Sequence, residues 1–298
     1  MWRRHHGEVP VGVIDVGSNT VRLVVVRGDR ELVSRREMLR LGASVERFGS
    51  IPADKLAETA EVVRRFAEAA RAADARLVEI LITSPGRQAA NGDELLDMLA
   101  RAGGCHARVL SAEEEGRLAF SGAFAATSPP ARQPVAVVDV GGGSAQVVVG
   151  TRRDGPTWAR SIDLGSQRLT SRLLPDDPPG RAALAHARTE VRSYLEGFDP
   201  PQPRIALAVG GSARALKRIT GPNLDAASLE DVLAVVATTP SATLAERYGI
   251  DRERVRTVAA GAVILSELQQ RLGIPLKVVR GGVREGALLE LAARRAAA

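Results

Sequence analysis

The stretch VGVIDVGSNTVRLVVV, residues 11–26, holds two short apolar runs separated by an aspartate and a loop of small polar residues. The runs are rich in β-branched residues and too short for helices, so they predict a strand, a tight loop and a second strand. Residues 135–150, VAVVDVGGGSAQVVVG, repeat the pattern with the aspartate and the first loop glycine in register. Both halves of the chain therefore open on the same hairpin, which indicates a duplicated fold.

A chain of 298 residues is long enough for two domains that each bury a core. The proline-rich segment TSPPARQP, residues 127–134, predicts a boundary that gives lobes of 1–126 and 127–298. Periodicity predicts helices over 56–70, 91–101, 112–126, 181–196, 213–219, 228–236, 255–270 and 286–296, and further strands over 77–82, 205–209 and 276–279. We therefore expect a two-lobed α/β protein with ligands bound in an interdomain cleft.

Composition limits the class of protein. Hydrophobic residues make up 45% of the chain and charged residues 26%, which is typical of globular proteins. No uncharged apolar run approaches the roughly 20 residues that span a bilayer, so we expect no membrane partner. Asp15 interrupts the first apolar run, which argues against a signal peptide, and the single Cys105 cannot form an internal disulfide. These features predict a cytoplasmic protein.

The net charge of +6 has two interpretations. It indicates a polyanionic partner, or it reflects only an arginine-rich composition in which three basic residues are lysine. Aromatic residues make up 3% of the chain, which leaves little material for stacking nucleic-acid bases. We therefore expect no nucleic-acid partner, and a phosphate-directed ligand is favoured over a base-directed one.

The two hairpin loops carry the residues expected of phosphate sites. Glycines let backbone N–H groups surround a phosphate, hydroxyls add donors, and an aspartate offers a hard oxygen to Mg²⁺. Ordinary hairpin turns also favour these residue types, but two copies in register favour phosphate binding from both lobes. The candidate ligands are Gly17, Ser18, Asn19 and Thr20 in the first loop, Gly141, Gly142, Gly143 and Ser144 in the second, and Asp15 and Asp139 for the metal.

A hydrolase needs a base to activate water, and three glutamates lie together at residues 113–115. Helical spacing places Glu115 on the apolar stripe with Leu118 and Ala119, where desolvation would suit a base. Glu114 lies three residues after Ser111 and predicts a capping box, and Glu113 lies on another face. We select Glu115, against the alternative that all three acids only complement the helix N-terminus.

Taken together, the motifs resemble those of the exopolyphosphatase and guanosine pentaphosphate phosphatase (Ppx/GppA) family, within the superfamily of actin, Hsp70 and sugar kinases. The resemblance rests on DVGSNTVRL, ITSPGRQAAN, LSAEEEGRLAF, DVGGGSAQ, IDLGSQRLTSRLL, AVGGSARAL and GGVREGALLE, in the family's order along nearly the whole chain. It implies a duplicated actin-like (ribonuclease H-like) ATPase fold. It also implies removal of terminal phosphate from inorganic polyphosphate, or from guanosine pentaphosphate, with Mg²⁺.

The resemblance assigns further roles. It selects Glu115, immediately before a small residue and an arginine, as the catalytic base, and makes Arg87 a phosphate ligand, although Pro85 and Gly86 depart from the family's pattern. Gly210, Gly211 and Ser212 end a strand and open a helix, and Arg284 opens the last one; both present donors to an anion, or are plain helix starts. Spacing gives no role to the motif of Gly165, Arg168 and Thr170.

Three functions stay open at this point. The first is an exopolyphosphatase, the second a guanosine pentaphosphate phosphatase at the same site, and the third a polyphosphate-binding or nucleotide-binding module without turnover. Mn²⁺ in place of Mg²⁺, a need for K⁺ and a homodimer are further expectations that rest on analogy alone. His5, His6, His106 and His186 form no metal-binding pattern and are expected at the surface.

Overall fold

This computed structural model describes residues 9–296, and the chain divides into two compact units. The first unit comprises residues up to 125 together with the segment from 283 onward, and the second comprises residues 126–282. The first boundary lies one residue from the predicted one. The last helix, however, which the sequence assigned to the second lobe, belongs to the first unit because its apolar face packs against the first strand.

The first unit is built on a five-stranded sheet in the order β3-β2-β1-β4-β5. β1 is antiparallel to β2 and parallel to β4, and the expected hairpin is confirmed. The elements are β1 (Val11–Val16), β2 (Thr20–Arg27), β3 (Arg30–Met38), α1 (Leu41–Phe48), α2 (Ala53–Ala72), β4 (Leu77–Ile82), α3 (Ser84–Gln88), α4 (Gly92–Gly103), β5 (His106–Val109), α5 (Ala112–Thr127) and α13 (Val283–Ala296).

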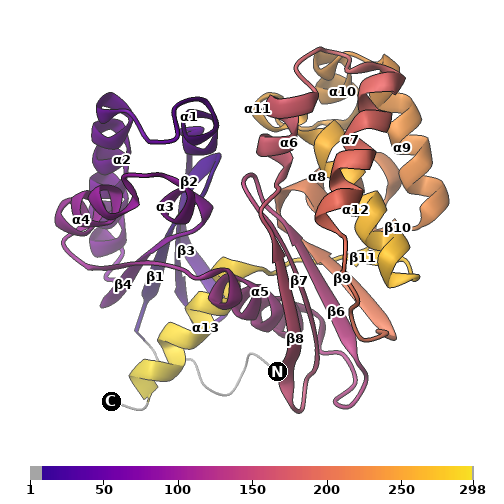
Figure 1. The fold of residues 1–298 in the computed structure, drawn as a ribbon. Coiled ribbons are helices and arrows are strands. Elements are labelled where there is room, and N and C mark those ends of the chain that lie inside the picture. The colour runs from indigo at the N-terminus through magenta and orange to yellow at the C-terminus, as the bar shows by residue number, and fades with distance from the viewer. Residues whose placement is uncertain (1–8, 297–298) are drawn as a thin grey trace. The chain divides into compact units, whose positions relative to one another are not determined.

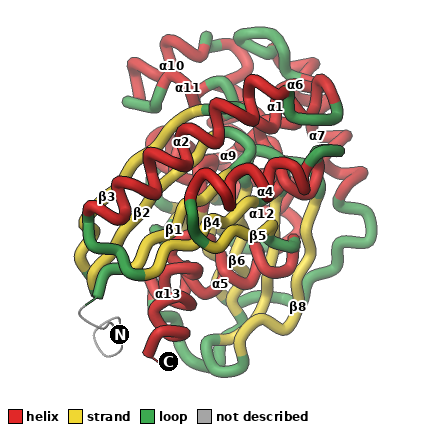
Figure 2. Tube along the Cα trace, turned by 90° about the vertical axis from the view of Figure 1, so that its left-hand side faces the viewer, coloured by secondary structure: helices red, strands yellow, loops and turns green. Residues whose placement is uncertain are grey.

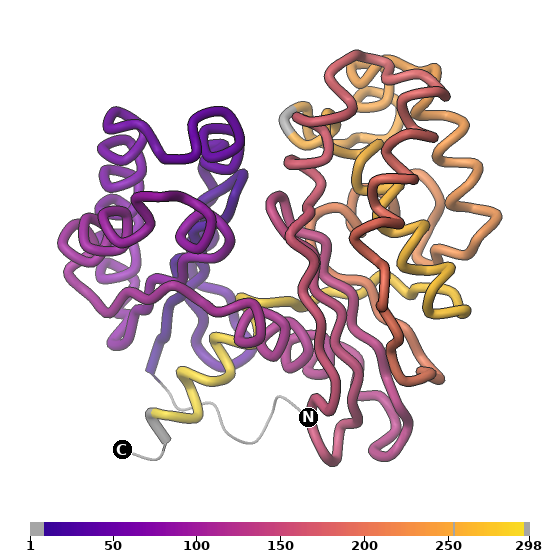
Figure 3. The backbone as a smooth tube through the Cα atoms, in the orientation of Figure 1, coloured from indigo at the N-terminus to yellow at the C-terminus, as the bar shows by residue number. Residues whose placement is uncertain are grey.

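Helices cover the two faces of this sheet. Figure 2 shows α2 and α4 lying across one face, where Leu56, Val63 and Phe66 of α2 join the core under the strands. On the other face, Leu288 and Leu291 of α13 pack in a smaller cluster with Val13 and Leu81. Figure 3 shows the yellow end of the chain beside the indigo start, so the first unit is closed by residues from both ends.

The second unit repeats the arrangement in a six-stranded sheet, β10-β11-β9-β6-β7-β8. β6 is antiparallel to β7 and parallel to β9, as β1 is to β2 and β4 (Figure 1). The elements are β6 (Val135–Val140), β7 (Ala145–Thr151), β8 (Gly155–Ile162), α6 (Ser166–Leu173), α7 (Gly180–Tyr194), β9 (Ile205–Val209), α8 (Gly210–Thr220), β10 (Asn223–Leu224), α9 (Ala226–Thr238), α10 (Ser241–Tyr248), α11 (Arg252–Val255), α12 (Val258–Leu272) and β11 (Leu276–Val278).

Both sheets thus share one core order, in which three antiparallel strands are followed by two parallel ones. Helix α12 is buried along almost its whole length, and its buried Glu267 accepts from Arg188 and Arg192 of α7. The predicted helix over 213–219 begins earlier, at Gly210, so the glycines after β9 form its first turn. The predicted helix over 255–270 corresponds to α12, which begins at Val258, and the short α11 ends at Val255 before it.

Candidate active site

Three parallel strands of the first unit end at the same edge of the sheet. Val16 at the end of β1 pairs with Ile82 at the end of β4, which pairs in turn with Val109 at the end of β5. The segments that follow these strands carry the first hairpin loop, α3 and α5. Sites in α/β proteins collect at the carboxyl ends of parallel strands, so this edge is the candidate site of the first unit.

Glu115 lies in the first turn of α5 and is 8% exposed. Leu118, Ala119 and Gly122 are buried on the same stripe, whereas Glu113 is exposed. The inward face predicted from the spacing of the three glutamates is confirmed. A carboxylate with so little solvent around it needs partners within the protein.

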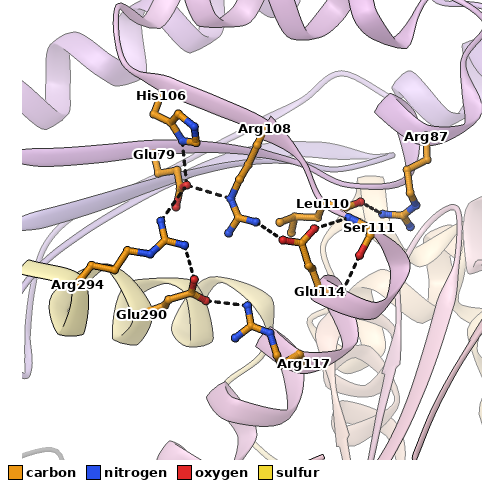
Figure 4. A network of polar contacts seen from close by, with 10 residues as sticks. All are labelled: Glu79, Arg87, His106, Arg108, Leu110, Ser111, Glu114, Arg117, Glu290 and Arg294. Carbon is orange, nitrogen blue, oxygen red and sulfur yellow. Dashed lines mark hydrogen bonds and ion pairs between the residues drawn. The ribbon is translucent and has the colours of Figure 1, made fainter.

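Arg87 supplies such a partner. Its Nη2 donates to Oε2 of Glu115 at 2.8 Å. Its Nη1 donates to the carbonyl of Leu110 at 2.7 Å (Figure 4). Arg87 lies in the short helix α3, in which Pro85 occupies a first-turn position that proline favours. Two residues predicted separately thus form one part-buried ion pair.

The capping box predicted at the start of α5 is confirmed. Ser111 Oγ accepts from the backbone N–H of Glu114 at 3.0 Å, and the Glu114 carboxylate accepts from the N–H of Ser111 at 2.9 Å. This bond to the Ser111 backbone, together with the Arg108 guanidinium, holds the pKa of Glu114 below its usual value. Glu114 therefore fixes the helix start, and Glu115 takes no part in this cap.

Substituting Ser111 by alanine should lower the free energy of unfolding by about 1 kcal/mol, because the helix start loses its cap. Urea unfolding at neutral pH measures the change. Ser121→Ala is the control, since Ser121 lies inside the same helix and bonds only back to the carbonyl of Arg117. Equal losses in the two variants would contradict the importance of the cap.

A network of charges holds α5 to the sheet (Figure 4). Glu79 of β4 is 3% exposed, and its Oε1 accepts from Arg108 Nε at 3.0 Å and contacts His106 Nδ1 at 3.1 Å. Arg108 also donates to Glu114 at 2.6 Å. A single arginine thus ties the first turn of α5 to a buried carboxylate of the central sheet.

Helix α13 is part of the same network. Glu290 accepts from Arg117 of α5 at 3.0 Å and also pairs with Arg294, which reaches Glu79 at 3.7 Å. At the crossing of the helices, a Cβ on Gly286 would overlap the backbone of Leu118. The backbones of α5 and α13 therefore approach closely at this glycine, and α13 packs directly against the helix that carries Glu115.

The first-loop aspartate is paired with an arginine from the other end of the chain. Arg284 Nη1 donates to Asp15 Oδ2 at 3.2 Å, and Arg22 lies opposite Asp15 on β2. Burial raises the pKa of Asp15 above its ordinary value, while both guanidinium groups act in the opposite direction. Arg284 was predicted as a ligand for phosphate, and the structure brings it to the predicted metal ligand.

The first loop is held by short hydrogen bonds. The N–H of Gly17 donates to the carbonyl of Thr20 at 3.0 Å, and Thr20 itself begins β2. The hydroxyl of Ser18 is buried and lies 2.6 Å from that of Ser84. The buried Oδ1 of Asn19 has no hydrogen-bond partner within the described chain. The serine therefore shapes the loop, whereas the asparagine oxygen is suited to a ligand.

The second loop has the same construction. The N–H of Gly141 donates to the carbonyl of Ser144 at 3.0 Å, as Gly17 does to Thr20. The buried hydroxyl of Ser144 accepts from Gln146 Nε2 at 2.9 Å, and Gln146 lies opposite the buried Asp139 on β7. Gly142 and Gly143 complete the turn.

Helix α8 begins directly against Asp139. Gly210 has φ +85°, and a Cβ there would overlap Oδ1 of Asp139, so only glycine fits. Gly211 lies beside Arg254 of α11, whose guanidinium atoms are nearest to it. Ser212 is buried in the first turn of the same helix. Asp139, the second loop and the start of α8 therefore form one group at the carboxyl ends of β6 and β9.

Three contacts were missing from the sequence interpretation. Arg22 could have been found, because a hairpin with residues 17–19 as its loop places it opposite Asp15. Ser84 lies in the quoted motif but carried no assigned role. Arg254 gave no signal, since it lies far from Gly211 in the sequence and no periodicity links them.

Residues 9–296 lack two further kinds of feature. No group of three or more acidic, histidine or cysteine side chains there is arranged to hold a metal ion. His106 and His186 are exposed, whereas His5 and His6 lie outside the described residues. No helix of that part of the chain is both long and apolar enough to cross a membrane.

The shared strand order of the two sheets, with one loop of glycine and hydroxyl residues after each first strand, defines the predicted actin-like ATPase class of α/β proteins. A family model described as the Ppx/GppA phosphatase family matches residues 24–295. The chain belongs to this family.

Relatives and solved structures agree with this assignment. The chain is 31% identical to exopolyphosphatase 1 of Mycobacterium leprae (strain TN), over 94% of this chain and 88% of that protein. It is 29% identical to exopolyphosphatase 2 of Mycobacterium tuberculosis (strain ATCC 25618 / H37Rv), over 95% and 98%. A crystal structure of an exopolyphosphatase-like protein superposes with a TM-score of 0.87 at 25% identity, covering 96% of this chain and all of that one. A PPX-GPPA enzyme of Aquifex aeolicus gives 0.77 at 25%, with coverage of 95% and 99%.

Proposed function

We propose that this protein is an exopolyphosphatase, which releases terminal orthophosphate from inorganic polyphosphate. The ion pair of the buried Glu115 with the half-buried Arg87 carries the proposal, because it joins a carboxylate that can accept a proton to a cation that can neutralise a phosphoryl group. A protein that only binds polyanions gains nothing from a buried carboxylate at its phosphate site. The relatives named as exopolyphosphatases support the substrate.

The proposed roles follow from the contacts. Glu115 takes the proton of the attacking water, and Arg87 holds the carboxylate in place before the substrate binds. A phosphoryl group at the Arg87 guanidinium then competes with Glu115 for its N–H donors. Once Arg87 binds the phosphoryl group, the carboxylate oxygen of Glu115 is released to accept the proton of water. The guanidinium then stabilises the negative charge that develops on the transferred group.

The donor set fits a hard divalent cation. Mg²⁺ needs one or two carboxylates and keeps several waters, so the lack of a larger acidic cluster does not argue against it. Asp15 and Asp139 are the proposed ligands, and the Oδ1 of Asn19, which has no partner within the described chain, is a proposed acceptor for a metal-bound water. When bound, the ion would neutralise phosphoryl charge. Occupation by a cation would also favour the ionised form of the buried Asp15.

One observation favours guanosine pentaphosphate as a second candidate substrate. Phe48 at the end of α1 is 55% exposed, the only exposed large apolar side chain among the described residues, and Arg47 stacks on it at 4.9 Å. Helix α1 begins against the first loop, where the N–H of Gly42 donates to Ser18. A nucleoside carried by phosphates at this loop could stack there, whereas polyphosphate has no base to stack.

A phosphate-release panel tests the function. Polyphosphates of several chain lengths should release orthophosphate, and removing divalent cations with EDTA should lower the rate about a hundredfold, since such ions contribute several kcal/mol to phosphoryl transfer. Guanosine pentaphosphate is assayed alongside, with Phe48→Ala as the discriminating variant. A preference for the guanosine substrate that the variant abolishes would support the second candidate. Binding without release of phosphate from either compound would identify a non-catalytic module.

A further inference from the structure

The motif of Gly165, Arg168 and Thr170 lies at the start of α6, and its backbone contacts the second loop. The N–H of Ser166 donates to the carbonyl of Gly141 at 2.9 Å, and those of Gln167 and Arg168 donate to the carbonyl of Gly142 at 2.9 and 3.1 Å. The hydroxyl of Ser166 adds a bond of 3.1 Å to Gly141. First-turn N–H groups have no partner within their own helix, so α6 uses them to hold loop carbonyls.

The first unit contains an equivalent contact. The N–H of Gly42 in α1 donates to the carbonyl of Ser18 at 2.8 Å. Just before α1, the N–H groups of Leu39 and Arg40 both donate to the carbonyl of Asn19 at 3.0 Å. Helices α1 and α6 follow the equivalent strands β3 and β8, so the contact between helix start and hairpin loop is duplicated together with the fold.

These bonds determine where the loop N–H groups point. In a planar trans peptide, the C=O and N–H bonds of one unit point in opposite directions. Because the carbonyls of Gly141 and Gly142 turn toward α6, the N–H groups of Gly142 and Gly143 turn away from it. In the first loop, the carbonyl of Ser18 turns toward α1 and directs the N–H of Asn19 away in the same manner.

The starts of α1 and α6 each need a glycine, because there is no room for a Cβ between the helix start and the loop. A Cβ on Gly165 would overlap the backbone of Gly142 and Gly143, although the φ of −112° at Gly165 is open to any residue. A Cβ on Gly42 would lie 2.8 Å from the Cβ of Ser18. Real Cβ atoms do not approach other atoms so closely, so a side chain at either position would push the helix start and the loop apart.

We infer that the starts of α1 and α6 are a pair of clamps that aim the N–H groups of the two loops at phosphoryl oxygens. Gly42 and Gly165 are their positioning residues. The inference rests on the proposed function. It gives Gly165 a role, whereas the proposed chemistry of Arg87 and Glu115 involves no part of α6. Ser166 belongs to the clamp through its hydroxyl, whereas Thr170 supports it by donating to the carbonyl of Ser166 at 2.7 Å.

Gly165→Ala tests the clamp. The added methyl group requires a shift on the order of 1 Å, and misplacement of that size costs up to about a hundredfold in activity. We expect the KM for polyphosphate to rise about tenfold or more, and direct binding of polyphosphate, measured by calorimetry in the Glu115→Gln background, to weaken equally. Gly42→Ala should act in the same direction on the first loop.

Gly150→Ala is the matched control. A Cβ on Gly150 would overlap the carbonyl of Gly155, but this position lies at the opposite end of β7 from the second loop. Its melting temperature should fall while its KM stays within about twofold of the wild-type value. Equal effects of Gly150→Ala and Gly165→Ala on KM would overturn the clamp, because both glycines would then serve stability alone.

Ser166→Ala decides the matter if Gly165→Ala does not fold. It removes one hydrogen bond to the loop and should raise KM about threefold to tenfold. An unchanged KM would overturn the inference. A wild-type protein that binds polyphosphate without releasing phosphate would contradict the proposed function alone, and the binding constants of the same variants would still decide the clamp.

Discussion

Glu115→Gln is expected to lower kcat for phosphate release by about 10²- to 10⁴-fold, the range contributed by a general base. The amide keeps the size of the side chain and can still accept from Arg87 through its oxygen, but it cannot take a proton from water. Binding of polyphosphate should stay close to the wild-type value. Orthophosphate release under saturating substrate and calorimetric binding measure the two quantities separately.

Glu113→Gln is the control for this substitution. Glu113 lies in the same turn of α5 and carries the same charge, but it is exposed and points away from the core stripe. Its kcat should stay within about twofold of the wild-type rate, because surface substitutions away from special features have small effects. Turnover by Glu115→Gln at the rate of this control would remove Glu115 as the base.

Arg87→Ala is expected to cost about 10³-fold or more in kcat/KM, the range known for arginines that stabilise phosphoryl transfer. The variant loses the charge for the phosphoryl group and also the two bonds that hold Glu115 and Leu110. Arg87→Lys should recover only part of the loss, because an ammonium lacks the planar fork that reaches both oxygens. Steady-state phosphate release measures both variants.

Arg101→Ala is the control for Arg87→Ala, because it removes one positive charge away from the candidate site. Arg101 is exposed in the last turn of α4 and is not part of the candidate site. Its kcat/KM should match the wild-type value within experimental scatter. If Arg87→Ala retains more than a tenth of wild-type activity, the guanidinium holds Glu115 but does not stabilise the transferred group.

The duplicated hairpins could be predicted from sequence because β-branched runs and turn residues are local signals. The strands β1, β2, β6 and β7 lie where the pattern placed them. Long amphipathic helices such as α2 were found for the same reason, since a stripe of apolar residues repeats over several turns. Local pattern and final structure agree for these elements.

Short or irregular elements escaped prediction. β5 has four residues and β8 carries exposed polar side chains at the edge of its sheet, so neither shows a clear alternation. The placement of α13 was wrong for a different reason. Its membership of the first unit depends on packing against β1, which is remote in sequence, and no local pattern reports such a contact.

In the candidate site too, the features set by local spacing could be predicted, and the contacts between remote residues could not. Helical spacing separated Glu115 from Glu113 and Glu114, because the choice depended on one turn of one helix. The bond between Asp15 and Arg284 joins residues 269 positions apart and could not be read from either segment. The clamp could not be predicted either, because it consists of backbone hydrogen bonds between α6 and the loop, and the only sign of these in the sequence is a glycine.

The return of α13 to the first unit also affects the order in which the chain is completed on the ribosome. Residues 126–282 are one continuous insertion, so the second unit can finish folding before α13 is synthesised. The first unit begins earlier but stays unfinished, because the cluster of Val13 and Leu81 is completed when Leu288 and Leu291 emerge. A nascent chain halted shortly before residue 283 would therefore expose a patch of its oldest strands, where a chaperone could bind.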